Sequence, residues 1–145
     1  MTQPFLADRR PLDVFREVMA RGEQPVPLAN LLGFRAVEVD AGRCVMELDS
    51  GPQHANIIGT LHGGVLATIA DSAMGVAFAA TLEAGERCTT VELRINFLRP
   101  FDRGRVRAVG QVVRRGRNIG YLECDLLDDA GQLLARSSST YMVLR

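Results

Sequence analysis

Lysine is absent from this sequence, so all 17 basic residues are arginines, and 17 acidic residues balance them. A chain without net formal charge has no overall field that would attract a nucleic acid or an anionic membrane. The sequence therefore predicts neither a nucleic-acid partner nor membrane association. Its 145 residues contain no internal repeat and suit one hydrophobic core, so we expect a single domain over residues 1–145.

Cysteine is scarce, and the pattern of the three that occur argues against two kinds of site. Cys44, Cys88 and Cys124 are far apart and odd in number, and none belongs to a C-x-x-C pair. The two histidines, His54 and His62, have no neighbouring cysteines. We therefore expect no disulfide framework and no metal site, and we predict a protein of the reducing cytoplasm.

The sequence also predicts neither a signal peptide nor an uninterrupted apolar segment that would span a membrane. Residues 1–15 have no apolar core of the kind that signal peptides contain. Residues 65–82 approach transmembrane length, but they are rich in alanine and include Asp71, Ser72 and Gly75. We therefore expect this segment to be a buried helix.

The sequence does contain a regular succession of helices and strands. Its periodicity predicts a helix at about 11–21, strands at 34–40 and 43–49, a long apolar helix from about Gly63 to residue 82, and strands within 88–100, 104–118, 119–129 and 133–145. A helix that is apolar on all sides must be wrapped, and the strands supply the apolar faces that wrap it. We therefore predict an α+β fold with a curved antiparallel sheet around a long central helix. The open edges of such a sheet favour dimerisation through an edge strand.

The strand within residues 88–100 shows a strict alternation of side chains. The pattern predicts that Thr89, Val91, Leu93, Ile95 and Phe97 share one face and that Thr90, Glu92, Arg94 and Asn96 share the other. A strand that borders the helix would turn one of these two faces inward.

Two glycines, Gly63 and Gly64, stand where the long helix begins. Without side chains, the backbone N–H groups of a helix N-terminus are uncovered and carry the positive end of the helix dipole. Such groups can bind an anion or a developing oxyanion. The alternative is that the glycines only permit a tight turn and close packing between helix and strand.

Asp71 lies in the apolar helix, eight residues after Gly63 and therefore on the same side of it. A carboxylate among apolar neighbours is costly unless it is paired or has a chemical role, such as proton transfer or nucleophilic attack. The alternative is a structural aspartate that accepts hydrogen bonds from a neighbouring strand. His62 is a candidate base, or else it stabilises the helix start. Asn56 can orient a water or a carbonyl, or else it only forms an Asx-turn.

The pattern Asn56-x-x-Gly59-Thr60-x-His62-Gly63-Gly64, followed by Asp71 in the helix, resembles the hotdog-fold acyl-CoA thioesterases of the phenylacetate-degradation (PaaI-type) group. The resemblance extends over about residues 30–144. It implies a hotdog fold and hydrolysis of acyl-CoA thioesters to free acid and CoA. It also implies no cofactor, since coenzyme A is part of the substrate, and a homodimer or a dimer of dimers.

The resemblance also implies roles for individual residues. Asp71 matches the residue that attacks the thioester carbonyl or activates water, and Gly63 matches the residue whose N–H polarises that carbonyl. His62 and Asn56 match residues that fix the loop and position carbonyl or water, and Thr90 matches a hydroxyl that holds water near the acid. In this group Asp71 faces the Asn56–Gly63 loop of a partner subunit.

Other residues are predicted to contact the substrate. The turn at residues 114–118 gathers three guanidiniums, which suit phosphate recognition, and the resemblance places it beside the nucleotide end of coenzyme A. The alternative is a solvated charged hairpin. The predicted substrate-binding residues are Gly64, Arg115, Arg117, Asn118, Ser139 and Thr140.

Two other functions remain open at this stage. Hotdog folds also host hydratases and dehydratases of acyl thioesters, for which His62 would be the partner of the acid. A non-catalytic acyl-CoA-binding module is the other alternative. The place of His62 directly before Gly63 fits the thioesterase loop better than a hydratase site. The joint presence of Asn56, Gly63, Asp71 and Thr90 argues against a loss of catalysis.

Overall fold

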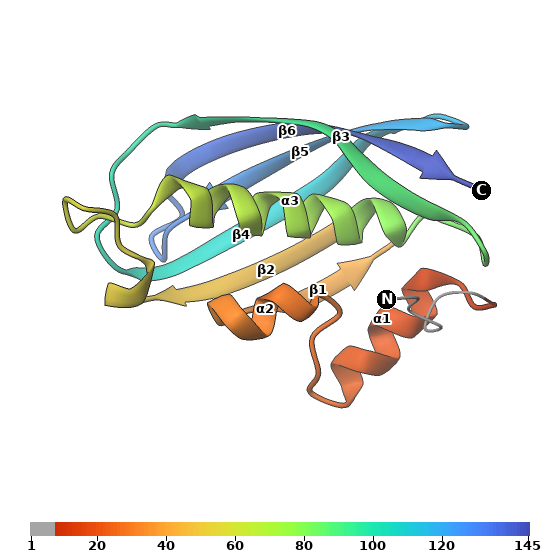
Figure 1. Cartoon of the computed structure of the whole chain (residues 1–145), viewed down its shortest axis with the longest axis horizontal. Coiled ribbons are helices and arrows are strands. Elements are labelled where there is room, and N and C mark those ends of the chain that lie inside the picture. The colour runs from red at the N-terminus through yellow and green to blue at the C-terminus, as the bar shows by residue number, and fades with distance from the viewer. Residues whose placement is uncertain (1–7) are drawn as a thin grey trace.

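The computed structural model describes residues 8–145, in which a curved antiparallel sheet surrounds one long helix (Figure 1). In chain order the elements are α1 (Pro11–Ala20), α2 (Pro27–Leu32), β1 (Phe34–Asp40), β2 (Arg43–Ser50), a short 3-10 helix (Pro52–His54), α3 (Gly63–Ala79), β3 (Arg87–Phe97), β4 (Gly104–Arg115), β5 (Ile119–Leu127) and β6 (Leu133–Leu144). The predicted start of the domain at residue 1 and the first part of the segment 1–15, on which the signal-peptide prediction was made, fall on residues 1–7, which lie outside the described residues.

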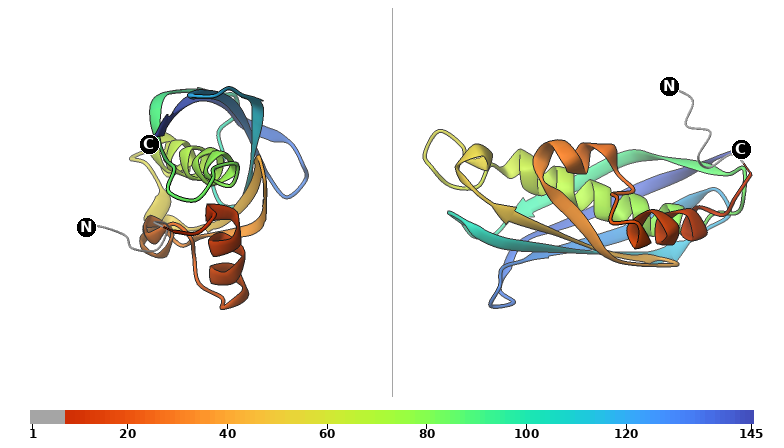
Figure 2. Two further views of the ribbon diagram at one scale, coloured as in Figure 1. Left: turned by 90° about the vertical axis from the view of Figure 1, so that its right-hand side faces the viewer. Right: turned by 90° about the horizontal axis from the view of Figure 1, so that it is seen from below.

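The six strands form one sheet in the order β1-β2-β4-β5-β6-β3, and every neighbouring pair is antiparallel. Viewed along the central helix, the sheet curls around α3 (Figure 2). The predicted α+β architecture, a hotdog fold, is confirmed. β1 and β3 are the two edge strands, and β3 was the strand with the strict alternation.

The helix α3 is enclosed by apolar contacts on most of its circumference. Its buried residues are Leu66, Ile69, Ala70, Ala73, Met74, Val76, Ala77 and Phe78. Close approach of β4 requires a glycine, since a Cβ atom on Gly110 would lie 2.8 Å from the backbone carbonyl carbon of Ala73. No helix within residues 8–145 is both long and apolar enough to cross a membrane.

The ends of α3 differ slightly from the prediction. It begins at Gly63, as expected, but it ends at Ala79 rather than at residue 82. Both the N–H and the hydroxyl of Thr81 donate to the carbonyl of Phe78, at 2.9 and 2.7 Å, and this turn terminates the helix.

Two helices precede the sheet, and only the first was predicted. α1 contacts the edge strand β1 (Figures 1 and 2), and its Val14 and Val18 are buried. No helix was predicted around Pro27, but a proline suits the first position of a helix, and α2 begins there. Gly33, with φ of 80°, ends α2 in a left-handed conformation.

The strict alternation predicted for β3 is wrong at Val91. The pairing with β6 shifts between Thr90 and Glu92, so Val91 is the extra residue of a β-bulge and is 56% exposed. Thr90 pairs directly with Tyr141. The bulge places Thr90 against α3, although Leu93 and Ile95 on the same strand also pack against the core.

Candidate active site

The Asp71 carboxylate is half-buried, rather than fully buried as expected, and is held by two hydroxyl groups. Its Oδ1 accepts a hydrogen bond from Thr90 Oγ1 at 3.0 Å and lies 2.7 Å from the hydroxyl of Tyr141. Within residues 8–145, no donor bonds to Oδ2 and no arginine pairs with this carboxylate. One oxygen of Asp71 is therefore fixed, and the other is left for chemistry.

Tyr141 was not predicted to be part of the site. Alternate residues of β6 are buried, and Ser137, Ser139 and Tyr141 share the inward parity. The alternation along β6 could have predicted that the Tyr141 side chain points inward. Its contact with Asp71 depends on the register with β3, which the sequence does not give. Burial raises the pKa of Tyr141 far above its usual range, and the hydrogen bond to Asp71 raises it further, so the phenol remains a donor.

The N-terminus of α3 leaves one N–H group without an acceptor. His62 caps the helix, because its Nδ1 accepts a hydrogen bond from the N–H of Gly64 at 2.9 Å. The N–H groups of Val65 and Leu66 both donate to the carbonyl of His62. Within the described part of the chain, no acceptor bonds to the N–H of Gly63. This N–H is available to polarise a carbonyl oxygen.

The loop before α3 is held by an Asx-turn. Asn56 Oδ1 accepts hydrogen bonds from the N–H groups of Ile58 and Thr60, and its Nδ2 donates to Thr60 Oγ1 at 2.8 Å. These contacts are structural, as one of the two interpretations of Asn56 expected. They shape the loop that precedes Gly63.

His54 fixes the same loop and was not predicted to do so. The imidazole is buried, its Nδ1 accepts from the N–H of Gly51 at 3.0 Å, and its Nε2 lies 2.8 Å from the carbonyl of Leu32. The backbone N–H of His62 donates to the carbonyl of His54. His54 thus connects the end of α2 to the start of α3.

A pocket of about 420 Å³ opens in front of Gly63. It is lined by Asn56, Thr60, Leu61, Gly63, Leu66, Phe97, Leu98, Arg99, Pro100 and Phe101. The Phe97 ring packs so closely that a Cβ atom on Gly63 would lie 2.8 Å from its Cζ. The glycine therefore permits the close packing of Phe97, as one of the two interpretations expected, and the binding of an oxyanion by its N–H stays a prediction.

Gly63 and Asp71 of one chain are too far apart to act on one carbonyl group. Eight residues at 1.5 Å per residue separate them by about 12 Å along α3, whereas a carbonyl must lie about 3 Å from both a donor and a nucleophile. Asp71 also does not line the pocket at Gly63. The structure therefore does not bring these two residues together within one chain.

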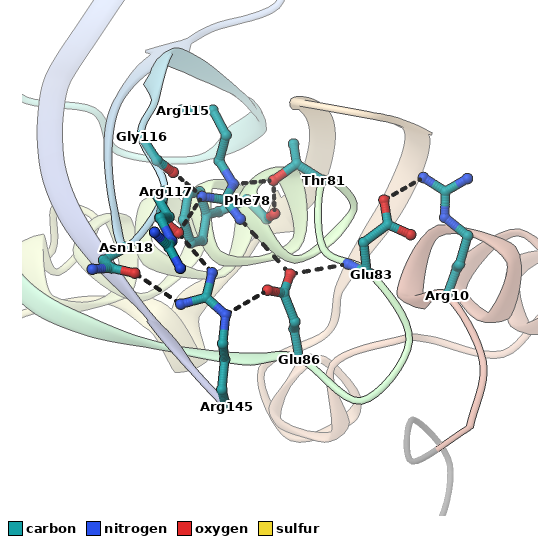
Figure 3. Close-up of polar contacts among 10 residues, drawn as sticks. All are labelled: Arg10, Phe78, Thr81, Glu83, Glu86, Arg115, Gly116, Arg117, Asn118 and Arg145. Carbon is teal, nitrogen blue, oxygen red and sulfur yellow. Dashed lines mark hydrogen bonds and ion pairs between the residues drawn. The ribbon is translucent and has the colours of Figure 1, made fainter.

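The arginine turn lies at the C-terminal end of α3 (Figure 3). The Arg115 guanidinium lies 5.0 Å from the centroid of the Phe78 ring, its Nε donates to Thr81 Oγ1 at 3.1 Å, and it also donates to the carbonyl of Gly116. Its Nη2 lies 3.8 Å from Glu86. Arg115 is therefore engaged within the chain.

Arg145 fixes the rest of this turn. It donates to Glu86 at 3.1 Å, to Asn118 Oδ1 at 2.8 Å and to the carbonyl of Arg117 at 2.9 Å. No carboxylate within residues 8–145 pairs with the guanidinium of Arg117, which is exposed. Of the turn residues predicted to bind substrate, Arg117 is thus the one with an uncommitted charge.

Two hydroxyls of β6 donate to Glu92 of β3. Ser139 is fully buried and donates to the carbonyl of Glu92 at 2.6 Å, while the half-buried Thr140 donates from Oγ1 to the Glu92 carboxylate at 3.2 Å. Inward parity leaves the Ser139 side chain no exposed surface within one chain. The substrate contacts of Ser139 and Thr140 stay predictions. Within the described residues, no cluster of three His, Cys, Asp or Glu side chains could hold a metal ion.

Comparison with known proteins defines the class to which this site belongs. Residues 58–135 match the family model of the Thioesterase superfamily, and the chain belongs to that family. It is 30% identical over 128 residues to Acyl-coenzyme A thioesterase 13 of Homo sapiens, covering 86% of this chain and 91% of that protein.

Solved structures give the same fold. A phenylacetic acid degradation-related protein from Ralstonia eutropha JMP134 is 35% identical, with a TM-score of 0.78 over 88% of this chain and 98% of that one. The PaaI protein of E. coli superposes with a TM-score of 0.81 over 96% of this chain and 97% of that one, at 21% identity, which speaks for the fold alone. The predicted membership of the PaaI-type hotdog thioesterases is confirmed.

Proposed function

We propose that this protein hydrolyses acyl-CoA thioesters to a free acid and coenzyme A. The observation that carries the proposal is a carboxylate with one hydroxyl-bound and one free oxygen, on the helix whose N-terminal Gly63 N–H has no acceptor. Membership of the thioesterase family and the similarity to an acyl-coenzyme A thioesterase support the choice of substrate.

The chemistry requires one acid and one oxyanion donor. Asp71 Oδ2 either attacks the thioester carbonyl or takes a proton from the attacking water, and the Gly63 N–H stabilises the oxyanion that develops. When water attacks, its oxygen bonds to the acyl carbon, the C–S bond breaks, and the proton taken up by Asp71 passes to the sulfur, so that coenzyme A leaves as a thiol. When Asp71 attacks, the C–S bond breaks to leave an acyl–Asp71 anhydride and the thiolate of coenzyme A; water then hydrolyses the anhydride to the free acid, which restores the carboxylate and supplies the proton of the thiol. Thr90 holds Oδ1 and keeps the carboxylate in place for this step.

The site is completed by a second copy of the chain. The separation of about 12 Å between Gly63 and Asp71 along α3 requires that the donor come from another chain. The edge strand β3 and the adjoining loop expose the apolar side chains of Ile57, Ile58, Val91, Phe97 and Leu98. Such a surface suits a homodimer, or a dimer of dimers, that pairs Asp71 of one protomer with the Asn56–Gly63 loop of the other.

The rest of the substrate would extend over residues outside the reacting centre. The exposed Arg117 guanidinium is suited to a phosphate of the coenzyme A nucleotide, with Arg115 and Asn118 shaping the turn. Gly64 gives its N–H to His62 and keeps the loop in shape. The compartment that we propose is the cytoplasm, because three unpaired cysteines fit a reducing environment.

The test is a panel of short-chain, long-chain and aryl acyl-CoAs with release of free thiol as the readout, run on the native protein and on Asp71→Asn. We expect turnover of at least one ester by the native protein and a fall in kcat of about 10³-fold in Asp71→Asn, which keeps the shape of the side chain. Binding of the esters without turnover would instead indicate a non-catalytic module. Full activity of Asp71→Asn would remove the acid from the mechanism.

A further inference from the structure

Tyr141 occupies a protected position next to the carboxylate that the proposed hydrolysis uses. It is 2% exposed, and its ring centroid lies 5.6 Å from that of Phe78. The hydroxyl lies 2.7 Å from Asp71 Oδ1 and 2.8 Å from the backbone carbonyl of the same residue. Because a phenol has one proton, these two acceptors share it, and both belong to Asp71.

The bulge in β3 makes Tyr141 and Thr90 direct cross-strand neighbours on the face toward α3. Both hydroxyls meet the same carboxylate oxygen, Oδ1, from two different strands. Two such contacts fix the rotation of the carboxylate group about its Cβ–Cγ bond. The free oxygen Oδ2 is therefore held in one orientation.

Gly75 provides the space that the Tyr141 hydroxyl needs. It lies four residues after Asp71 and therefore on the same face of α3. A Cβ atom on Gly75 would lie 3.3 Å from the Tyr141 hydroxyl oxygen, which would have to shift by a few tenths of an ångström. Glycine is a poorer helix former than alanine, so a packing reason explains its place in the middle of this helix.

We propose that Tyr141 is a positioning residue of the active site, which orients Asp71 through Oδ1, and that Gly75 is the small residue that admits its hydroxyl. The expected effect on kcat rests on the proposed hydrolysis. The contact between Tyr141 and Asp71 does not depend on any activity and is tested separately.

The kinetic test compares Tyr141→Phe and Gly75→Ala with the matched control Tyr121→Phe. Tyr121 is the other tyrosine of the chain, and its hydroxyl lies 3.3 Å from Glu123 on an exposed part of β5. We expect kcat to fall by about 10- to 100-fold in Tyr141→Phe and by several-fold in Gly75→Ala, with KM unchanged, because only the orientation of the acid is altered. Tyr121→Phe keeps the native kcat. Native kcat in Tyr141→Phe or in Gly75→Ala overturns the proposal.

A spectroscopic test works without any turnover and so separates this inference from the proposed function. In the Tyr121→Phe background, Tyr141 is the only tyrosine, and the sequence has no tryptophan to mask its ultraviolet absorbance. A phenol that donates to a carboxylate absorbs at a longer wavelength than one that donates to a neutral amide, because the charged acceptor makes the stronger hydrogen bond. Adding Asp71→Asn should therefore shift the Tyr141 band to shorter wavelength at neutral pH. If the two spectra coincide, the hydroxyl does not bond to the Asp71 carboxylate, and the proposal is wrong.

Discussion

The two ends of α3 are held by different chemical groups: backbone and uncharged polar groups at the N-terminal end, and charged side chains at the C-terminal end. At the N-terminal end, backbone amides, an Asx-turn and two histidine rings shape the loop, and the N–H of Gly63 remains without an acceptor among residues 8–145. At the C-terminal end, charged side chains from separate elements bond to one another, with Glu86 between Arg115 and Arg145 (Figure 3).

The difference indicates where each kind of chemistry is possible. A backbone donor is rigid and costs no reorganisation when charge develops on a substrate, so it suits catalysis. Long side chains that are already paired hold a turn in shape, whereas the exposed guanidinium of Arg117 has no carboxylate partner among residues 8–145, which suits binding. We therefore expect changes at the N-terminal end to lower kcat and changes at the C-terminal end to alter KM or stability.

Of the changes at the two ends of α3, the largest effect is expected from removing the Gly63 N–H by Gly63→Pro. Proline suits the first position of a helix, and His62, at φ −65° and ψ 129°, has the extended conformation that a residue before proline requires. Loss of one oxyanion donor should lower kcat by about 10²- to 10³-fold.

The matched control is Gly63→Ala, which crowds Phe97 in the same way but keeps the N–H. The two variants should have similar thermal stability and very different rates, measured by thiol release. If Gly63→Ala loses as much kcat as Gly63→Pro, then packing against Phe97, and not the N–H, is what this position supplies.

Mixing variants tests whether the two halves of the site come from different chains. In a heterodimer of Gly63→Pro and Asp71→Asn protomers, one site has both residues intact and the other has neither. Random pairing makes half of the dimers mixed, so the mixture should recover about a quarter of the native activity. No recovery after co-refolding, with exchange of protomers verified by mass spectrometry of tagged chains, would contradict a shared site.

The sequence predicted most of this architecture because alternation and helical periodicity report which faces are buried. The strand boundaries at Phe34–Asp40 and the start of α3 at Gly63 followed directly from those patterns. The bulge at Val91 did not, since the apolar residues Val91, Leu93 and Ile95 alternate through it without a break, although Val91 is exposed. The contact of Tyr141 with Asp71 depends on that bulge and on the register of β6, and neither is local in sequence.

A smaller effect is expected from the two arginines at the C-terminal end of α3. Arg117→Ala removes an uncommitted charge and should raise KM for coenzyme A esters about tenfold with little change in stability, as the loss of one charged hydrogen bond would do. Arg115→Ala removes the contacts to Phe78 and Thr81 and should lower the free energy of unfolding by about 2 kcal/mol.

Denaturant titration and steady-state kinetics on both variants separate these outcomes. Salt provides an additional check, because a phosphate contact at Arg117 weakens as ionic strength rises. An unchanged KM in Arg117→Ala would exclude the turn from substrate binding and leave the interpretation of a solvated charged hairpin.

The smallest expected effect concerns the thiol of Cys88, whose pKa is influenced by both Asp71 and Arg115. Burial raises the pKa of the Cys88 thiol to about 11, Arg115 opposes this rise, and Asp71 adds to it. Alkylation at mildly alkaline pH, which requires the thiolate, should therefore be slow in the native protein. It should be a few-fold faster in Asp71→Asn and slower in Arg115→Ala, with Cys88→Ser identifying the reacting group.

Cys44 is more deeply buried, with a thiol pKa raised to about 12, and should react later. Equal rates in the native protein and in both variants would mean that neither Asp71 nor Arg115 affects the thiol of Cys88. The active-site acid and the arginine turn would then have no common electrostatic influence on this residue.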